Sequence, residues 1–186
     1  MSIIRDKYEE KCRTPSDINE HLPTLLKYAK QCGHITEMGV RSIVSTWALL
    51  EGAPKRMVSI DLNHPSATGG NLQEVYDGAN QAGIDFKFLQ ASSIEVRIEP
   101  TDLLFIDTWH VYEQLKSELE RHAKKVGKYI ILHDTETFCK KGETEGHLGL
   151  CAALGDFLMD PSCEWIVVEH FKNNNGLTVL GRKNAS

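Results

Sequence analysis

The sequence has few of the features that mark extracellular, membrane-spanning or nucleic-acid-binding proteins. No apolar run approaches the length needed to cross a bilayer, and neither end carries the apolar core of a signal peptide. The formal net charge is −5 and no cluster of Lys and Arg is present, which argues against a nucleic-acid surface. We therefore expect a cytoplasmic protein whose partners are neither membranes nor nucleic acids.

The spacing of the cysteines carries no recognisable pattern. An odd number without a C-x-x-C pair indicates neither a zinc site nor a disulfide framework. The five cysteines are Cys12, Cys32, Cys139, Cys151 and Cys163.

The chain length leaves room for one domain. The 186 residues, of which 41% are hydrophobic, suit a single compact domain. Residues 1–15 are polar and end at Thr14-Pro15, so we expect a loosely packed N-terminal arm there. Residues 16–186 then form the folded domain.

Apolar strand patterns alternate with helical patterns along this domain, which predicts a parallel sheet with right-handed crossovers. Asn174-Asn175-Gly176 indicates a tight hairpin that adds antiparallel strands at one edge. We expect helices over about 16–31 (weakened by Pro23), 45–51, 71–81, 110–126 and 148–159, and strands over 34–37, 56–61, 85–89, 102–107, 129–134, 165–170 and 177–180.

A single glycine stands at the centre of the most informative stretch, His34 to Trp47. The pattern predicts a strand through Glu37, a turn at Gly39 and then a helix. Glycine permits a sharp turn and the close approach of a ligand to the backbone. About twenty residues later a second strand ends at Asp61, an offset that suits bonding to the hydroxyl pair of a ribose.

Two glycines of the dinucleotide fingerprint G-x-G-x-x-G are missing, because Arg41 and Val44 occupy the second and third positions. A pyrophosphate fits poorly against those side chains. S-adenosylmethionine carries no phosphate, so its loop tolerates them. The glycine count therefore favours a methyl donor over a nicotinamide cofactor, although a strand-glycine-helix turn is also ordinary architecture in α/β proteins.

Four of the expected strands end in an acid, at Glu37, Asp61, Asp107 and Asp134. One such acid is commonly a helix cap. If the strands that carry Asp107 and Asp134 are neighbours, their ends lie roughly 5 Å apart, within reach of one divalent cation. His133 is a further candidate ligand, although successive strand residues face opposite sides and imidazole suits manganese, iron or zinc better than magnesium.

The runs Asp102–Glu113 and Tyr129–Asp134 resemble the small class I S-adenosylmethionine-dependent methyltransferases, and most of all methyltransferase family 24, grouped with cephalosporin-hydroxylase-like proteins. The similarity spans about residues 16 to 182. It implies a doubly wound, Rossmann-like seven-stranded sheet of order 3-2-1-4-5-7-6 with helices on both faces and a C-terminal antiparallel hairpin. The residues implied at the donor are Glu37, Gly39, Ser45, Asp61, Ser92 and Asp107, and those implied at a magnesium or manganese ion are Asp107, His133 and Asp134.

The implied reaction is an in-line transfer of a methyl group from S-adenosyl-L-methionine to a hydroxyl oxygen of a small molecule or glycan. A cation at Asp107 can lower the pKa of that hydroxyl, and His110 or His133 is the alternative general base. Two other functions stay open: a nucleotide-sugar or NAD-dependent enzyme on the same sheet, and a methyltransferase-like domain that has lost its chemistry and binds a partner.

Overall fold

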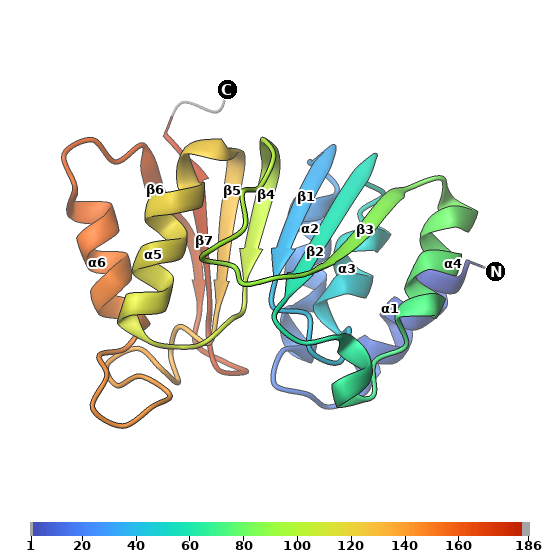
Figure 1. The fold of residues 1–186 in the computed structure, drawn as a ribbon, viewed down its shortest axis with the longest axis horizontal. Coiled ribbons are helices and arrows are strands. Elements are labelled where there is room, and N and C mark those ends of the chain that lie inside the picture. The colour runs from blue at the N-terminus through green and yellow to red at the C-terminus, as the bar shows by residue number, and fades with distance from the viewer. Residues whose placement is uncertain (1, 184–186) are drawn as a thin grey trace.

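The computed structural model describes residues 2–183, which form a three-layered α/β fold (Figure 1). The sheet has seven strands in the order β3-β2-β1-β4-β5-β7-β6, as the family resemblance implies. The strands are β1 (His34–Met38), β2 (Arg56–Asp61), β3 (Asp85–Gln90), β4 (Thr101–Ile106), β5 (Val126–His133), β6 (Trp165–Phe171) and β7 (Leu177–Arg182).

The first five strands pair in parallel, while β7 runs antiparallel to both β5 and β6. The turn between β6 and β7 has left-handed backbone at Asn174, Asn175 and Gly176, with φ of 45°, 69° and 93°. Asn and Gly tolerate this conformation best, which explains why the hairpin was recognisable from the sequence.

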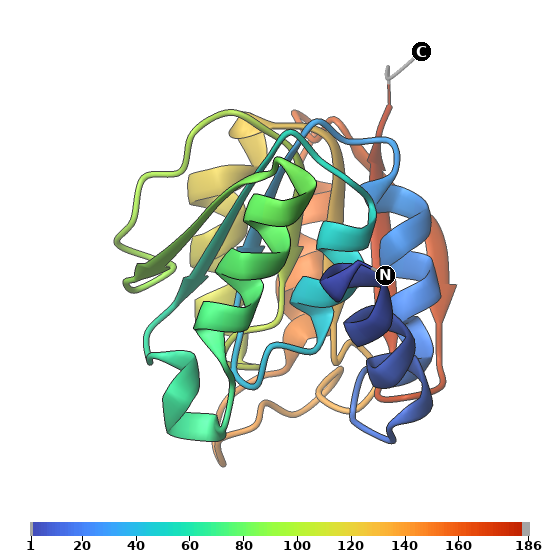
Figure 2. The same cartoon turned by 90° about the vertical axis from the view of Figure 1, so that its right-hand side faces the viewer.

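Helices cover both faces of the sheet, as Figures 1 and 2 show. One layer contains α1 (Ile3–Arg13), α2 (Leu22–Ala29), α3 (Ser45–Glu51) and α4 (Leu72–Ala82), and the other contains α5 (Tyr112–His122) and α6 (Leu150–Met159). Short 3₁₀ turns lie at Asn19–His21, Pro65–Thr68 and Ala123–Lys125. Among the described residues, no helix combines the length and apolar character needed to span a bilayer.

The buried side chains of β4 alternate between two hydrophobic clusters, one on each side of the sheet. Leu103 and Phe105 pack with the α1–α4 layer, whereas Leu104 and Ile106 pack with α5 and α6. A strand at the centre of the sheet is buried on both faces, so its sequence is a continuous apolar run. This burial fixes the carboxyl end of β4, where the candidate site begins.

The expectation of a loosely packed arm over residues 1–15 was wrong. Ile3–Arg13 form a helix whose Ile4 and Tyr8 are buried, four residues apart on one face. Arg5 also bonds Glu51 of α3, and Lys7 pairs with Glu74 of α4. Two apolar anchors and these ion pairs are enough to dock a helix that is polar elsewhere.

The helix expected over 16–31 begins later, because the 3₁₀ turn at Asn19–His21 precedes α2 and Pro23 lies in the first turn of α2. Proline has no N–H, and the first helical turn is where that donor is not needed. Pro23 therefore restarts the helix.

Cys139 and Cys151 form a disulfide bond, contrary to the expectation from cysteine spacing. Their Cα atoms lie 4.7 Å apart because the backbone of Cys151 donates to the carbonyl of Cys139. Tertiary contacts create this proximity, and no local sequence pattern encodes it.

Candidate functional site

Four titratable side chains meet at the carboxyl edge of the sheet, where β4 and β5 end. Asp107 follows β4, His133 is the last residue of β5, and Asp134 comes next. The parallel pairing of Ile106 with Leu132 sets these ends side by side, as expected. His110 joins them from the loop that leads to α5.

The two imidazoles each point one nitrogen at both carboxylates. Nε2 of His110 lies 3.2 Å from Oδ1 of Asp107 and 3.0 Å from Oδ2 of Asp134. Nδ1 of His133 lies 3.3 Å and 3.2 Å from the same two oxygens. Two oxygens and two nitrogens therefore converge on one small volume.

A left-handed residue makes this convergence possible. Successive residues of a strand face opposite sides, so His133 and Asp134 would separate if the strand continued. Asp134 instead has φ of 60°, which turns its side chain back beside His133. Such a conformation is rare for a non-glycine residue and is a recurrent feature of functional sites.

The other nitrogen of each ring faces an acceptor. Nδ1 of His110 lies 3.1 Å from Glu143, and Nε2 of His133 lies 3.0 Å from the carbonyl oxygen of Asp17. Both nitrogens of each ring face oxygens that only accept, so either nitrogen can carry the hydrogen of a neutral ring. When the outer nitrogen carries it, the inner nitrogen presents its lone pair to Asp107 and Asp134.

Lone pairs that face two carboxylates need a positive charge between them. A proton is one solution: burial opposes ionisation of both rings, but the bonds to Asp107 and Asp134 outweigh it and raise the pKa of His110 and of His133 to about 10. Burial likewise opposes ionisation of Asp107 and Asp134, and the two imidazoles overcome it and lower the pKa of both carboxyl groups.

A divalent cation is the other solution, and the donor set fits one. Donor atoms of Asp107, His110 and Asp134 all lie within 4.8 Å of one another. Ligands at right angles about 2.1 Å from a cation lie about 3.0 Å apart, close to the observed spacings. Oδ1 of Asp134 is buried and has no hydrogen-bond partner within residues 2–183, so it offers a further free ligand atom.

His110 is placed as a metal ligand, a role that the sequence analysis did not give it. There it was expected only as a general base, and His133 was the expected ligand. His133 does contact both carboxylates, yet its side chain is fully buried, whereas that of His110 is 16% exposed. The ring of Phe138 stacks on that of His110 at 4.8 Å and 8°, which holds the imidazole in plane. Neither Glu143 nor Phe138 was singled out from the sequence, since both lie on the irregular segment after β5.

The turn after β1 lies next to this cluster. Gly39 has φ of 86°, and the left-handed conformation recurs at Arg41 and Ile43, with φ of 45° and 61°. Three alternate residues of the loop, 39, 41 and 43, thus have the left-handed conformation that favours glycine, although only the first of them is a glycine. Asp61 stabilises it: Oδ2 accepts bonds from the N–H groups of Val40 and Arg41, at 2.7 Å and 3.0 Å.

Glu37 lies beneath the loop in a buried network with three hydroxyl groups. Its carboxylate accepts bonds from Ser45 at 2.6 Å, Thr46 at 2.9 Å and Ser59 at 2.6 Å. Burial raises the pKa of Glu37 to about 7 despite these bonds. Glu37 and Ser45, both expected at the donor, therefore contact each other and support the loop from below.

A second buried acid joins the loops that follow β3 and β4. Oε1 of Glu118, on α5, accepts bonds from Ser93 at 2.6 Å and from Thr108 at 2.8 Å. Ser92, the residue expected at the donor, adjoins Ser93 at this edge. Glu118 was not predicted, although a glutamate between Leu115 and Leu119 on the apolar face of a helix is a usable signal.

A cavity of about 190 Å³ lies between the Gly39 loop and the acid cluster. A larger cavity of about 480 Å³ lies between α5 and α6, away from the clustered acids and imidazoles. A catalytic site needs polar groups that converge on one point, and only the smaller of these two cavities adjoins such a cluster. We therefore assign the candidate site to the smaller cavity. The residues lining it are Ile18, Gly39, Val40, Arg41, Ser42, Val44, Ser45, Asp107, Thr108, His110 and Glu143.

No protein-family profile and no curated protein sequence matches this chain. Solved structures nevertheless share its fold. A protein of Corynebacterium glutamicum superposes with a TM-score of 0.67 at 15% identity, covering 99% of this chain and 91% of that one. The SAH-bound methyltransferase PaMTH1 of Podospora anserina gives 0.65 at 14%, covering 98% and 88%. An O-methyltransferase of Bacillus cereus in complex with SAH gives 0.64 at 14%, covering 97% and 90%. The chain therefore has the Rossmann-like fold of these methyltransferases.

Proposed function

We propose that this protein is an S-adenosylmethionine-dependent methyltransferase that acts on a hydroxyl oxygen of a small molecule or glycan with the help of a divalent cation. The observation that carries the proposal is the cluster of two carboxylates and two imidazoles beside the Gly39 loop. The fold shared with SAH-bound methyltransferases supports the choice of donor.

The donor is assigned to the cavity along the Gly39 loop. Oδ1 of Asp61 accepts one bond, from the N–H of Asn63 at 2.8 Å, and so keeps a lone pair for a ribose hydroxyl. Gly39 and Asp107 border the cavity, and Ser92 is assigned to the adenine side. Glu37 and Ser45 act indirectly, by holding the loop in place.

The residues that would hold the cation are Asp107, His110 and Asp134, with His133 as a fourth donor. Two imidazoles favour manganese or another transition metal over magnesium. When bound, such a cation lowers the pKa of the acceptor hydroxyl and supplies positive charge near the attacking oxygen.

The chain itself supplies orientation. Glu143 and the carbonyl of Asp17 fix the two rings, so the inner nitrogens keep their direction toward the carboxylates. Direct transfer of the hydroxyl proton to His110 or His133 is disfavoured, because the bonds to Asp107 and Asp134 raise the pKa of each ring to about 10 and both rings already carry that proton near neutral pH when no cation is bound. Membership of methyltransferase family 24 is part of this proposal and depends on residues 102–113 and 129–134, which contain all four clustered residues.

Calorimetric titration with S-adenosylhomocysteine, NAD and a nucleotide sugar tests the donor assignment. We expect binding of S-adenosylhomocysteine alone. Binding of NAD or of the nucleotide sugar without it would overturn the proposal.

A further inference from the structure

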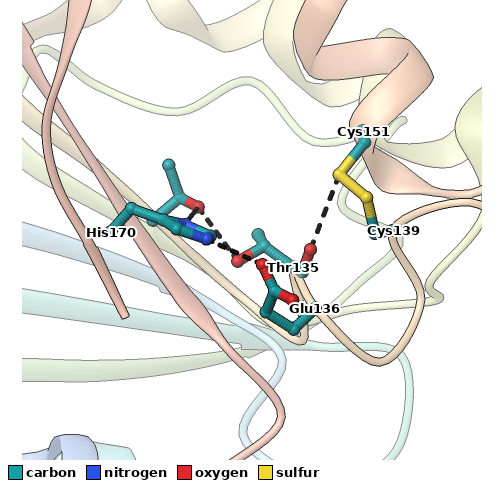
Figure 3. The surroundings of a disulfide bond; sticks show 6 residues. Thr135, Glu136, Cys139, Cys151 and His170 are labelled. Atoms are coloured by element: carbon teal, nitrogen blue, oxygen red, sulfur yellow. Dashed lines mark hydrogen bonds and ion pairs between the residues drawn. A yellow bond between two sulfur atoms is a disulfide. The ribbon is translucent and has the colours of Figure 1, made fainter. Parts of the chain in front are cut away.

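The disulfide between Cys139 and Cys151 closes a loop that lies against the candidate site. The two cysteines are 12 residues apart in the sequence, and Cys151 lies in the first turn of α6. Backbone bonds from Leu150 to Phe138 at 2.8 Å and from Cys151 to Cys139 at 3.0 Å accompany the disulfide. Figure 3 shows the bond beside Thr135 and Glu136, just after β5.

The closed loop carries the outer partner of His110. The carboxylate of Glu143 accepts from Nδ1 of His110 at 3.1 Å, and its backbone N–H donates to the carbonyl of His110 at 3.0 Å. Thr144 accepts a bond from the indole of Trp109 at 3.2 Å, and the carbonyl of Leu148 accepts one from the N–H of Tyr112 at 2.9 Å. The loop therefore holds one ring of the cluster in orientation.

Asp134, in contrast, has anchors besides the disulfide, although Sγ of Cys151 lies 3.5 Å from the carbonyl oxygen of Thr135. The next residue, Thr135, bonds Thr178 of β7 at 2.9 Å, and Glu136 bonds His170 of β6 at 2.8 Å. These two contacts come from the sheet, and Figure 3 shows them beside the contact between Cys151 and the carbonyl of Thr135. Loss of the disulfide would thus release Glu143 while Asp134 stays in place.

We propose that Cys139 and Cys151 are a thiol–disulfide switch that sets how firmly Glu143 orients His110. Both cysteines are half-buried rather than sealed in the core, so small thiols can reach them. The effect of the switch on activity rests on the proposed methyltransferase function. In the dithiol form the protein keeps the donor site but binds the cation more weakly.

The switch reaction is an exchange with a small disulfide such as oxidised glutathione. One cysteine thiolate attacks it and releases one glutathione, and the second cysteine then displaces the other glutathione from the mixed disulfide. The two protons lost by the cysteines end on the two released glutathione thiols. A dithiol reductant reverses both steps.

Hydrogen exchange of the wild-type protein, equilibrated with oxidised glutathione or with a dithiol, tests the switch without any assumption about function. We expect the amides of Gly142, Glu143 and Gly149 to exchange at least tenfold faster in the dithiol form, and the amide of Phe138, bonded to the carbonyl of Asp134, to be unchanged. Equal exchange in the two forms would overturn the proposal, as would alkylation and mass analysis showing free thiols at both positions after oxidation.

Titration with Mn²⁺ then connects the switch to the site. We expect affinity about tenfold lower in the dithiol form, the loss typical of an outer partner of a metal-bound histidine. The double variant C139S/C151S should show the lower affinity whatever the redox condition, and the control C163S, which changes a free cysteine, should behave as wild type. Redox-dependent exchange with no Mn²⁺ binding in either form would keep the switch and refute the cation site, so the two failures are distinguishable.

Discussion

Gly39 lies directly against the backbone carbonyl of Asp107: a Cβ atom built on Gly39 would lie 1.8 Å from that oxygen. Gly39 belongs to the loop assigned to the donor, and Asp107 belongs to the acid cluster. The absence of a side chain at one residue thus lets the two halves of the candidate site touch.

Gly39→Ala should therefore be costly. The new Cβ overlaps a backbone atom that cannot move aside, and alanine is strained at φ of 86°. We expect a loss of about 2 to 5 kcal/mol in the free energy of unfolding, measured by chemical denaturation. Gly83→Ala is the matched control: φ is 71°, but no atom lies within 4 Å of the added Cβ, so only the strain of about 1 kcal/mol should appear. Equal losses in the two variants would show that contact with Asp107 is unimportant.

Asp134→Asn should abolish Mn²⁺ binding while changing the affinity for S-adenosylhomocysteine by less than about threefold. The substitution keeps the shape of the side chain and removes the charge that both imidazoles face. Calorimetry measures both ligands. Glu113→Gln serves as the control, since Glu113 makes a comparable contact with His147 but lies outside the cluster. Crystals soaked in manganese give an independent check, and Mn²⁺ bound as tightly by the variant would contradict the assignment.

All four residues of the cluster were named from the sequence, but local patterns alone account only for the strands and for Asp107 and Asp134, and the strand order was implied by the family resemblance. The apolar runs before Asp107 and Asp134 identify central parallel strands, and parallel neighbours end at the same edge. No local pattern reveals that Asp134 turns left-handed, so only the family resemblance placed His133 and Asp134 at the same ion. Glu143 lies on an irregular segment that is positioned by a disulfide, and long-range closure of that kind leaves no periodic signal.

Glu37 should give the stability a measurable pH dependence. Its pKa is raised by burial from 4.5 to about 7, so the unfolded chain releases this proton before the folded protein does. The contribution of Glu37 to stability is then fully present below about pH 4.5 and is lost as the pH rises to about 7. Unfolding measured between pH 5 and 8 should show a smaller decline in Glu37→Gln than in wild type. The amide suits the site because the hydroxyls of Ser45, Thr46 and Ser59 can reverse to accept a bond. Identical pH profiles would refute the raised pKa.

Asp61→Ala should weaken both the fold and donor binding. Three backbone N–H groups lose their acceptor, which costs about 1 to 3 kcal/mol, and the proposed ribose contact is lost as well. Asp160→Ala is the matched control, because Asp160 accepts from the N–H of Ser162 in a similar turn away from the site. We expect the control to keep full affinity for S-adenosylhomocysteine, whereas an Asp61 variant with unchanged affinity would leave Asp61 a purely structural residue.

Arg41→Gly tests whether the unusual loop restricts the donor site. Arg41 adopts φ of 45° and lines the cavity, and its guanidinium pairs with Asp17 at 2.5 Å on the protein surface. Glycine relieves about 1 kcal/mol of backbone strain, while loss of an exposed ion pair costs about 0 to 1 kcal/mol, so the net stability should change little.

Removing the Arg41 side chain widens the cavity, and we expect S-adenosylhomocysteine to bind several-fold more tightly by calorimetry. Arg41→Asn provides the comparison, because asparagine tolerates the left-handed backbone yet keeps a short side chain at the cavity wall. Weaker binding by the glycine variant than by wild type would mean that the Arg41 side chain contacts the donor. The loop would then bind the donor through Arg41, and Arg41 would not narrow the cavity.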